Sequence, residues 1–205
     1  MNKNKNTQKT IQRREDILKY AAKSFAEKGY HKTTLDDIAR KIGISKPALY
    51  YYIKSKNELL QEITQQVMTG ITQVMVEIES SHLTPSDKLR RFTHEAIIFA
   101  CEHRTAYRIL FEQDHMLPRK ARENIQKERK ELEQFLQCII EEGIRDDSLA
   151  VIDPKIACFT VLGACDWPYR WYHSNGLLNP MQIADVIIDL LENGYIRKKQ
   201  KGRQI

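Results

Sequence analysis

Several residue types and patterns are scarce in this 205-residue chain, and each shortage excludes a class of protein. The 8 glycines and 6 prolines are too few for a collagen-like or low-complexity chain. The four cysteines are isolated from one another, so we expect small buried side chains rather than a disulfide framework or a zinc site. No apolar run approaches the roughly 20 residues of a membrane-spanning helix, and the polar N-terminus lacks a signal-peptide pattern. We therefore expect a cytoplasmic protein without membrane contacts.

Charge is divided unevenly along the chain, whose formal net charge is +6. Residues 1–56 carry 14 basic and 5 acidic side chains, whereas residues 57–205 carry 19 and 22. A basic N-terminal quarter favours a module that binds a polyanion, although a basic face that only keeps the protein in solution fits the charge equally well. The change of charge places the expected boundary between a domain over 1–56 and a domain over 57–205. A second basic cluster over 197–203 is interpreted as a frayed tail.

The spacing of apolar residues predicts an all-α protein. They recur every three or four positions, and no stretch alternates with a period of two. Gly29, Gly43, Gly143 and Gly176 are expected to end helices, and Pro168 either kinks a helix or ends it. The predicted helices cover residues 12–28, 35–42, 46–52, 56–80, 86–102, 105–114, 119–143, 154–174 and 180–196.

The segment over 35–52 has the pattern of a helix-turn-helix. Gly43 supplies the positive φ that a tight turn between two short helices needs. Apolar residues of both helices can pack on the helix over 12–28, which leaves the start of the second helix facing outward. Its capping Ser45 and free N–H groups suit a phosphate, and the small Ala48 allows close approach to base edges.

Four segments carry a family resemblance. They are Thr-Thr-Leu-Asp-Asp-Ile-Ala over 33–39, Gly-Ile-Ser-Lys over 43–46, Leu-Tyr-Tyr-Tyr-Ile over 49–53 and Ser-Lys-Asn-Glu-Leu-Leu over 55–60. Together they resemble the DNA-binding domain of the TetR family of bacterial repressors. The resemblance implies that Ser45, Pro47, Ala48 and Tyr51 face bases or sugars. It implies phosphate contacts for Thr33, Thr34, Lys46, Tyr50, Tyr52 and Lys56.

The same resemblance implies a C-terminal domain that dimerises and binds a small molecule. The helices over 154–174 and 180–196 are apolar on more than one stripe, as expected for a core and a homodimer interface together. The pattern from Asp153-Pro154 to Gly194 is similar to TetR-type regulators that sense acyl-CoA or related thioesters. Aromatic side chains that could line the effector site are Phe99, Tyr107, Phe111, Trp167 and Trp171. A basic cluster at Arg119, Lys120 and Arg122 could meet coenzyme A phosphates or could form a solvated helix face.

These observations predict a homodimeric repressor that binds a pseudo-palindromic operator and is released by a hydrophobic or thioester effector. Two recognition helices would lie roughly 34 Å apart, one turn of DNA. A repressor responsive to drugs or aromatic compounds, a metal sensor using Cys101, His103, His94 or His115, and a non-specific DNA organiser stay open. No catalytic motif is present, so we expect no enzyme activity, no cofactor and no metal.

Overall fold

The chain folds entirely into helices over the part that the structure describes. The computed structural model describes residues 2–150 and 152–194, except for the side chains of residues 2–7 and 9. Its helices are α1 (Asn2–Lys28), α2 (Leu35–Lys41), α3 (Lys46–Tyr52), α4 (Lys56–Glu79), α5 (Pro85–Glu102), α6 (Arg104–Glu112), η1 (Asp114–Met116), α7 (Arg119–Arg145), α8 (Pro154–Asp166), α9 (Pro168–Trp171) and α10 (Pro180–Asn193). The all-α prediction is confirmed. Among these described residues, no helix is long and apolar enough to cross a bilayer.

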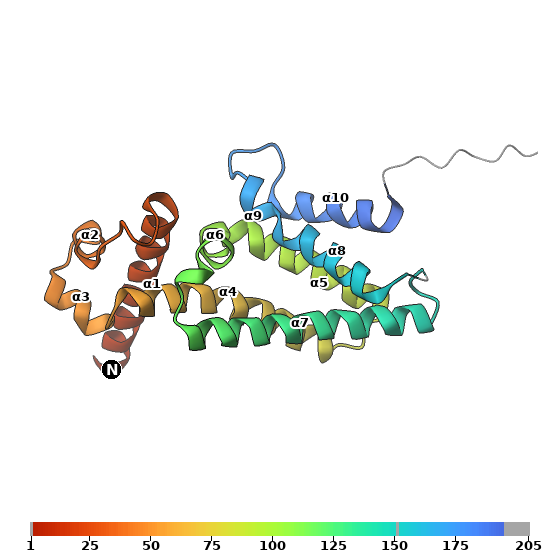
Figure 1. Ribbon diagram of the computed structural model, residues 1–205, viewed down its shortest axis with the longest axis horizontal. Helices are drawn as coiled ribbons and strands as arrows, with labels where there is room; N and C mark the ends of the chain where they lie inside the picture. The colour runs from red at the N-terminus through yellow and green to blue at the C-terminus, as the bar shows by residue number, and fades with distance from the viewer. Residues whose placement is uncertain (1, 151, 195–205) are drawn as a thin grey trace, which may run out of the picture.

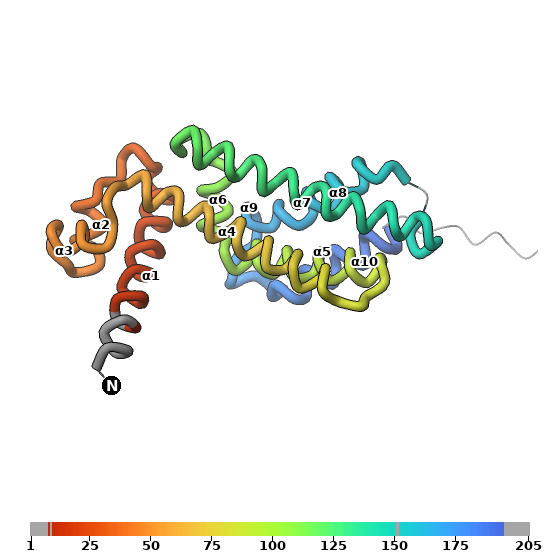
Figure 2. Tube along the Cα trace, turned by 90° about the horizontal axis from the view of Figure 1, so that it is seen from below, coloured from red at the N-terminus to blue at the C-terminus, as the bar shows by residue number. Residues whose placement is uncertain are grey.

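The helices form an N-terminal group and a larger bundle, joined by α4. Figure 1 shows α1, α2 and α3 at one end of the molecule, and α5, α7, α8 and α10 at the other. One apolar cluster packs the N-terminal helices against α4 and α6, with Phe25, Leu59 and Leu110 among its buried members. A second cluster fills the bundle and includes Ile97 and Ile183. Figure 2 shows α4 as the continuous element that leaves the N-terminal group and enters the bundle.

Capping residues set several helix starts where the sequence predicted them. The Thr34 hydroxyl accepts from Asp37 N at 3.1 Å, and the Asp37 carboxylate accepts from Thr34 N at 3.2 Å. The two bonds form a capping box. Ser45 caps α3, and Ser55 caps α4 through Glu58 N at 3.1 Å. The helix over 12–28 is longer than predicted, because α1 already begins at Asn2. Its first turns have no apolar stripe, so periodicity could not reveal them.

Two predicted helix ends differ in the structure. The helix predicted over 154–174 ends at Asp166, and Pro168 begins the separate four-residue helix α9. Gly143 does not end α7, which continues to Arg145. The following turn is made instead by Asp147, which has a φ of 60°. Beside it, Ser148 N donates to the carboxylate of Asp146 at 3.0 Å. The last residues of the helix predicted over 180–196, and the basic cluster over 197–203, lie outside the described residues.

Helices α4 and α5 approach closely at one glycine. Gly70 of α4 lies against the ring of Phe99 on α5, and any Cβ at position 70 would overlap the ring atoms. The glycine therefore permits a close approach of α4 and α5 that any side chain at position 70 would disturb.

Candidate DNA interface and ligand domain

Helices α2 and α3 form the predicted helix-turn-helix. Gly43 has a φ of 69° in the turn between them, a conformation that a residue with a Cβ rarely adopts. Ile38 and Leu49 are fully buried, and they join Ile17 and Phe25 of α1 in one core. Burial of both inner faces leaves the outer face of α3 available to a partner.

The exposed start of α3 carries most of the residues expected to meet bases. Tyr51 is 80% exposed, and its ring makes an edge contact with Tyr52 at 5.2 Å between centroids. Ala48 and Tyr52 are half-buried. Lys46 is held by Asp36, with 3.1 Å between Nζ and the carboxylate, which raises the pKa of the lysine. The other expected contacts on this surface are exposed, namely Thr34, Ser45, Pro47 and Tyr50.

Two residues expected to hold phosphates have inward-facing side chains. Thr33 is fully buried, and its hydroxyl donates to the carbonyls of Ser24 and Gly29 at 3.1 and 3.0 Å. The Lys56 ammonium donates to the carbonyls of Tyr30 and Thr33 at 2.9 and 3.0 Å. It also lies 4.2 Å from the centre of the Tyr30 ring. In this conformation both side chains stabilise the domain itself. That they contact phosphates stays a prediction.

The helix-turn-helix is fastened to α4 by several side chains. Arg14 of α1 pairs with Glu62 and with Glu58 of α4, and these carboxylates raise the pKa of the guanidinium. It also donates to the carbonyl of Tyr52 at 3.2 Å. Gln113, just after α6, donates to the carbonyl of Phe25 at 2.9 Å. The three N-terminal helices and the start of α4 therefore form one unit that contacts α6.

The structure brings together three of the five aromatic residues predicted to line an effector site. Tyr107 is 2% exposed, and its ring lies 6.1 Å from the rings of both Phe99 and Phe111. Trp167 and Trp171 are 56% and 44% exposed and are not part of this cluster. The prediction that they line a cavity with the other three is therefore not supported.

Sequence reasoning missed three further members of this region. Tyr169 stacks on Phe111, with centroids 5.4 Å apart and planes inclined by 7°. The Arg129 guanidinium lies 4.9 Å from the Phe111 ring. Burial raises the pKa of Asp166 to about 7, against a lowering by Arg129. Two of them have a sequence signal: Asp166 is an acidic residue at the end of an otherwise apolar helix, and Tyr169 belongs to the aromatic stretch that follows it.

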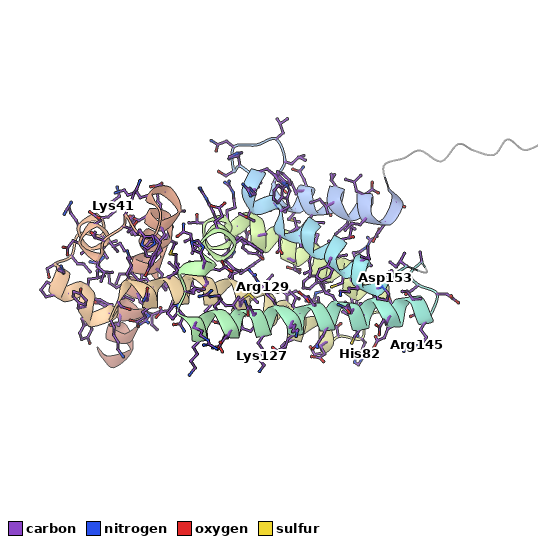
Figure 3. All side chains as sticks on the ribbon, viewed as in Figure 1. Lys41, His82, Lys127, Arg129, Arg145 and Asp153 are labelled. Carbon is purple, nitrogen blue, oxygen red and sulfur yellow. The ribbon has the colours of Figure 1, made fainter. Side chains whose placement is uncertain are left out.

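Two arginines of α7 have unused hydrogen-bonding capacity. Among the described residues, the buried atoms Arg122 Nε and Arg129 Nη2 have no hydrogen-bond partner. Figure 3 shows Arg129 and Lys127 on opposite sides of α7, with Lys127 facing solvent. Seven residues separate the two arginines, so they share a helix face. That face can accept an anionic or strongly polar group.

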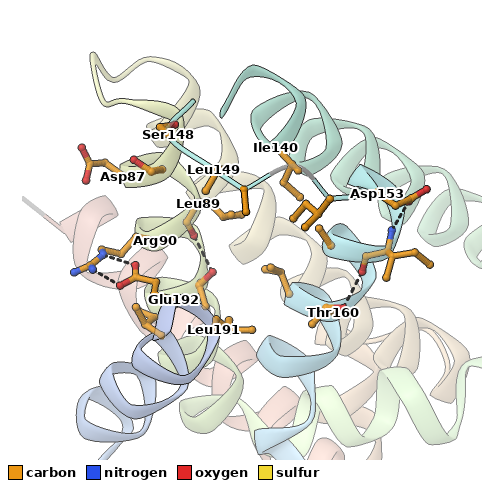
Figure 4. Close-up of a pocket in the computed structure, with 18 residues that line it drawn as sticks. Asp87, Leu89, Arg90, Ile140, Ser148, Leu149, Asp153, Thr160, Leu191 and Glu192 are labelled. Carbon is orange, nitrogen blue, oxygen red and sulfur yellow. Dashed lines mark hydrogen bonds and ion pairs between the residues drawn. The ribbon is translucent and has the colours of Figure 1, made fainter. Parts of the chain in front are cut away.

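A separate cavity of about 840 Å³ lies between α5, α8 and α10. Figure 4 shows Leu89, Ile140, Leu149 and Leu191 around it, with the ion pair of Arg90 and Glu192 at one side. None of the five predicted aromatic residues lines this cavity. Its size is that of a small-molecule site.

An exposed apolar surface covers the outer sides of α8 and α10, and we call it the α8–α10 face. Its large side chains are 40% to 65% exposed and are Ile156, Phe159, Met181, Val186, Leu190 and Leu191. Large apolar side chains exposed on two helices are typical of an interaction site. Two of them, Ile156 and Leu191, also line the cavity. Gly163 also opens onto free space, since a Cβ added there would meet nothing within 4 Å.

The cysteines and histidines do not gather into a metal centre within residues 2–150 and 152–194, where no three potential ligands lie together. Cys101, Cys158 and Cys165 are buried as expected. Cys138 is exposed, which corrects the expectation for that residue, because it lies on the outer side of α7. His103 stacks on Phe99 with 4.0 Å between ring centroids.

A helix-turn-helix joined to a helical bundle defines a DNA-binding regulator, and comparisons with known proteins identify its family. The model for "Tetracyclin repressor-like, C-terminal domain" matches residues 82–195, and that for "Bacterial regulatory proteins, tetR family" matches residues 17–63. A crystal structure of a TetR/AcrR-family regulator from Thermobifida fusca YX-ER1 is 33% identical, with a TM-score of 0.72. That match covers 91% of this chain and 100% of the other.

Two further relatives match over nearly their whole length. The repressor KstR2 of Mycolicibacterium smegmatis is 25% identical over 91% of this chain and 92% of its own. AibR, crystallised with isovaleryl coenzyme A and operator DNA, is 26% identical with a TM-score of 0.74. The match covers 87% of this chain and 97% of AibR. The chain belongs to the TetR family of bacterial transcriptional regulators. It is therefore a transcriptional regulator and not an enzyme.

Proposed function

We propose that this protein represses transcription as a homodimer on a pseudo-palindromic operator and is released by an acyl-CoA or a related thioester. The DNA-binding part corresponds to residues 1–56 and the effector and dimer part to residues 57–205. The exposed outer surface of α3, centred on Tyr51, is the observation that supports operator binding. Tyrosine hydroxyls reach phosphates while their rings pack on sugars.

The α8–α10 face supports the homodimer. Its exposed Ile156, Phe159 and Val186 would leave water when a second copy packs on them. A symmetric pair of these faces would hold the two α3 helices in a fixed relation, as a two-fold operator requires.

The shared face of Arg122 and Arg129 supports a thioester effector. Guanidinium groups match phosphate and carboxylate geometry, and two buried nitrogen atoms of these side chains have no partner among the described residues. The neighbouring rings of Phe111 and Tyr169 offer a flat apolar surface. KstR2 and the AibR complex with isovaleryl coenzyme A agree with this class of effector.

Fluorescence anisotropy tests the proposal. DNA from upstream of the gene is compared with a scrambled duplex, with and without lauroyl-CoA and isovaleryl-CoA. We expect specific binding that a thioester releases, and Arg129→Met should require at least tenfold more thioester for release. Lys127→Met on the opposite side of α7 serves as the control. Release of Arg129→Met at the wild-type concentration would exclude this arginine, and specific binding indifferent to both thioesters would exclude the effector class.

A further inference from the structure

The cavity between α5, α8 and α10 has a chemistry that differs from the arginine-rich face of α7. We propose that it is a second ligand site, which binds an amphiphile with an apolar body and a neutral or positively charged head group. The inference is independent of the thioester proposal, because the two sites share no residue.

The size and wall of the cavity determine the body of the ligand. A volume of about 840 Å³ falls in the range of small-molecule pockets. Aliphatic side chains from four helices and the connection after α7 form most of the wall, among them Leu89, Ile140, Leu149, Val161 and Ile188. An alkyl chain or a fused-ring hydrocarbon would leave water on entering it.

The hydroxyl groups of the wall already have partners. The Ser86 hydroxyl contacts the Thr84 hydroxyl at 3.1 Å, and the Ser148 hydroxyl donates to the carbonyl of Gly143 at 3.4 Å. Thr93 donates to the carbonyl of Leu89, and Thr160 donates to the carbonyl of Ile156, both at 2.8 Å. A polar group placed beside them would lose its water without gaining a donor. The polar end of the ligand must therefore lie at the opening, where the charged residues are.

The charges at the opening select the head group. Asp87, Asp153 and Glu192 line the cavity and are exposed to solvent. The single basic residue of the wall, Arg90, is exposed as well and pairs with Glu192. These four side chains carry a net charge of −2. The N-terminal dipoles of α5 and α8 each offset about half a charge, which leaves roughly one negative charge. A coenzyme A head group with several negative charges would be repelled, whereas an ammonium group or an uncharged alcohol would not.

The position of the cavity connects it to the α8–α10 face. Val161 and Ile188 line the cavity, and Phe159 and Val186 of the same two helices are exposed on the α8–α10 face. Ile156 and Leu191 of that face also line the cavity, so the two adjoin. A ligand that separates α8 from α10 would therefore change the surface on which a second copy packs.

One set of ligands with a common C12 chain tests the head-group selection. Dodecyltrimethylammonium, dodecanol, laurate and lauroyl-CoA compete with the neutral fluorescent probe N-phenyl-1-naphthylamine on the full-length protein, below micellar concentrations. We expect the two ligands without negative charge to displace the probe at lower concentrations than laurate, and lauroyl-CoA to be weakest. Equal competition by all four, strongest competition by lauroyl-CoA, or no competition at all would overturn the proposal.

Variants locate the site. Asp153→Asn keeps a good N-cap residue but removes a charge, and should weaken dodecyltrimethylammonium about two- to tenfold. The matched control is Asp189→Asn, which makes the same change on α10 outside the wall of the cavity. Glu192→Gln should free Arg90 and strengthen laurate by a similar factor, and Val161→Trp should fill the cavity and abolish competition. Wild-type competition profiles in all three cavity variants would overturn the location. Lauroyl-CoA that releases operator DNA without displacing the probe would support two separate sites.

Discussion

Lys56 gives a direct test of the structure, because the sequence and the structure assign it different partners. The family pattern assigns it to a DNA phosphate, whereas in the structure its ammonium donates to the carbonyls of Tyr30 and Thr33. We predict that Lys56→Met lowers the stability of the protein and leaves the salt dependence of operator binding unchanged. Methionine keeps most of the apolar stem and removes only the charged donor.

The contacts of Lys56 set the size of the effect. Two hydrogen bonds from a charged donor contribute about 1.5–3 kcal/mol each when fully formed, and a cation–π contact adds about 0.5–1 kcal/mol. The side chain is half-buried, and desolvation lowers the pKa of its ammonium, so part of this gain is lost. We expect the free energy of unfolding to fall by about 1–2 kcal/mol.

Two measurements separate the alternatives for Lys56. Urea unfolding reports the stability, and operator affinity over a range of KCl concentrations reports the number of neutralised phosphates. Lys130→Met, an exposed change on α7, controls for the loss of one positive charge. If Lys56 binds a phosphate, the slope of log affinity against log salt falls by about 0.9 for each subunit. That fall, together with wild-type stability, would refute the reasoning.

Three further predictions concern an exposed tyrosine, a glycine beside open space and a buried carboxyl group. Tyr51→Ala should weaken operator binding at least tenfold in anisotropy while the dimer mass in light scattering stays constant; unchanged affinity would exclude it from the interface. Gly163→Leu should shift sedimentation toward monomer without destabilising the fold, because the space beside it is open, and an intact dimer would contradict this. The raised pKa of Asp166, about 7, means that the folded state binds a proton more tightly than the unfolded state. As the pH rises from roughly 4 to 7, the free energy of unfolding should thus fall by up to about 1.4 kcal/mol per pH unit. Asp166→Asn should remove this slope in urea titrations, and an unchanged slope would assign it to other groups.

Local signals explain how much of the fold could be predicted. The short helices α2 and α3 are bounded by Thr34, Gly43 and Ser45, whose chemistry acts within a few residues and is visible in a sequence. The start of α1 was missed because a helix without an apolar stripe has no periodic signal. Gly143 was misinterpreted because its lack of a Cβ serves the packing of Leu149, which lies across the following turn.

The candidate site was less predictable, because its contacts are distant in the chain. The partners of Lys56 are backbone carbonyls 23 and 26 residues away, and no residue pattern encodes them. Trp167 and Trp171 have the same composition signal whether they line a cavity or face a second subunit. Arg129 looks like any charged residue of a surface helix until α6 is packed against it.

The contact of Gly70 with Phe99 has a mechanical consequence. Where two helices touch through long side chains, rotamer changes absorb a displacement of an ångström or so before either backbone moves. At Gly70 the helix α4 has no side chain that could change its rotamer, because the Phe99 ring lies directly against its main chain. A molecule that pushes the Phe99 ring toward α4 would therefore move the helix itself. The missing methyl group thus couples the Phe99 ring directly to the helix that carries the DNA-binding unit.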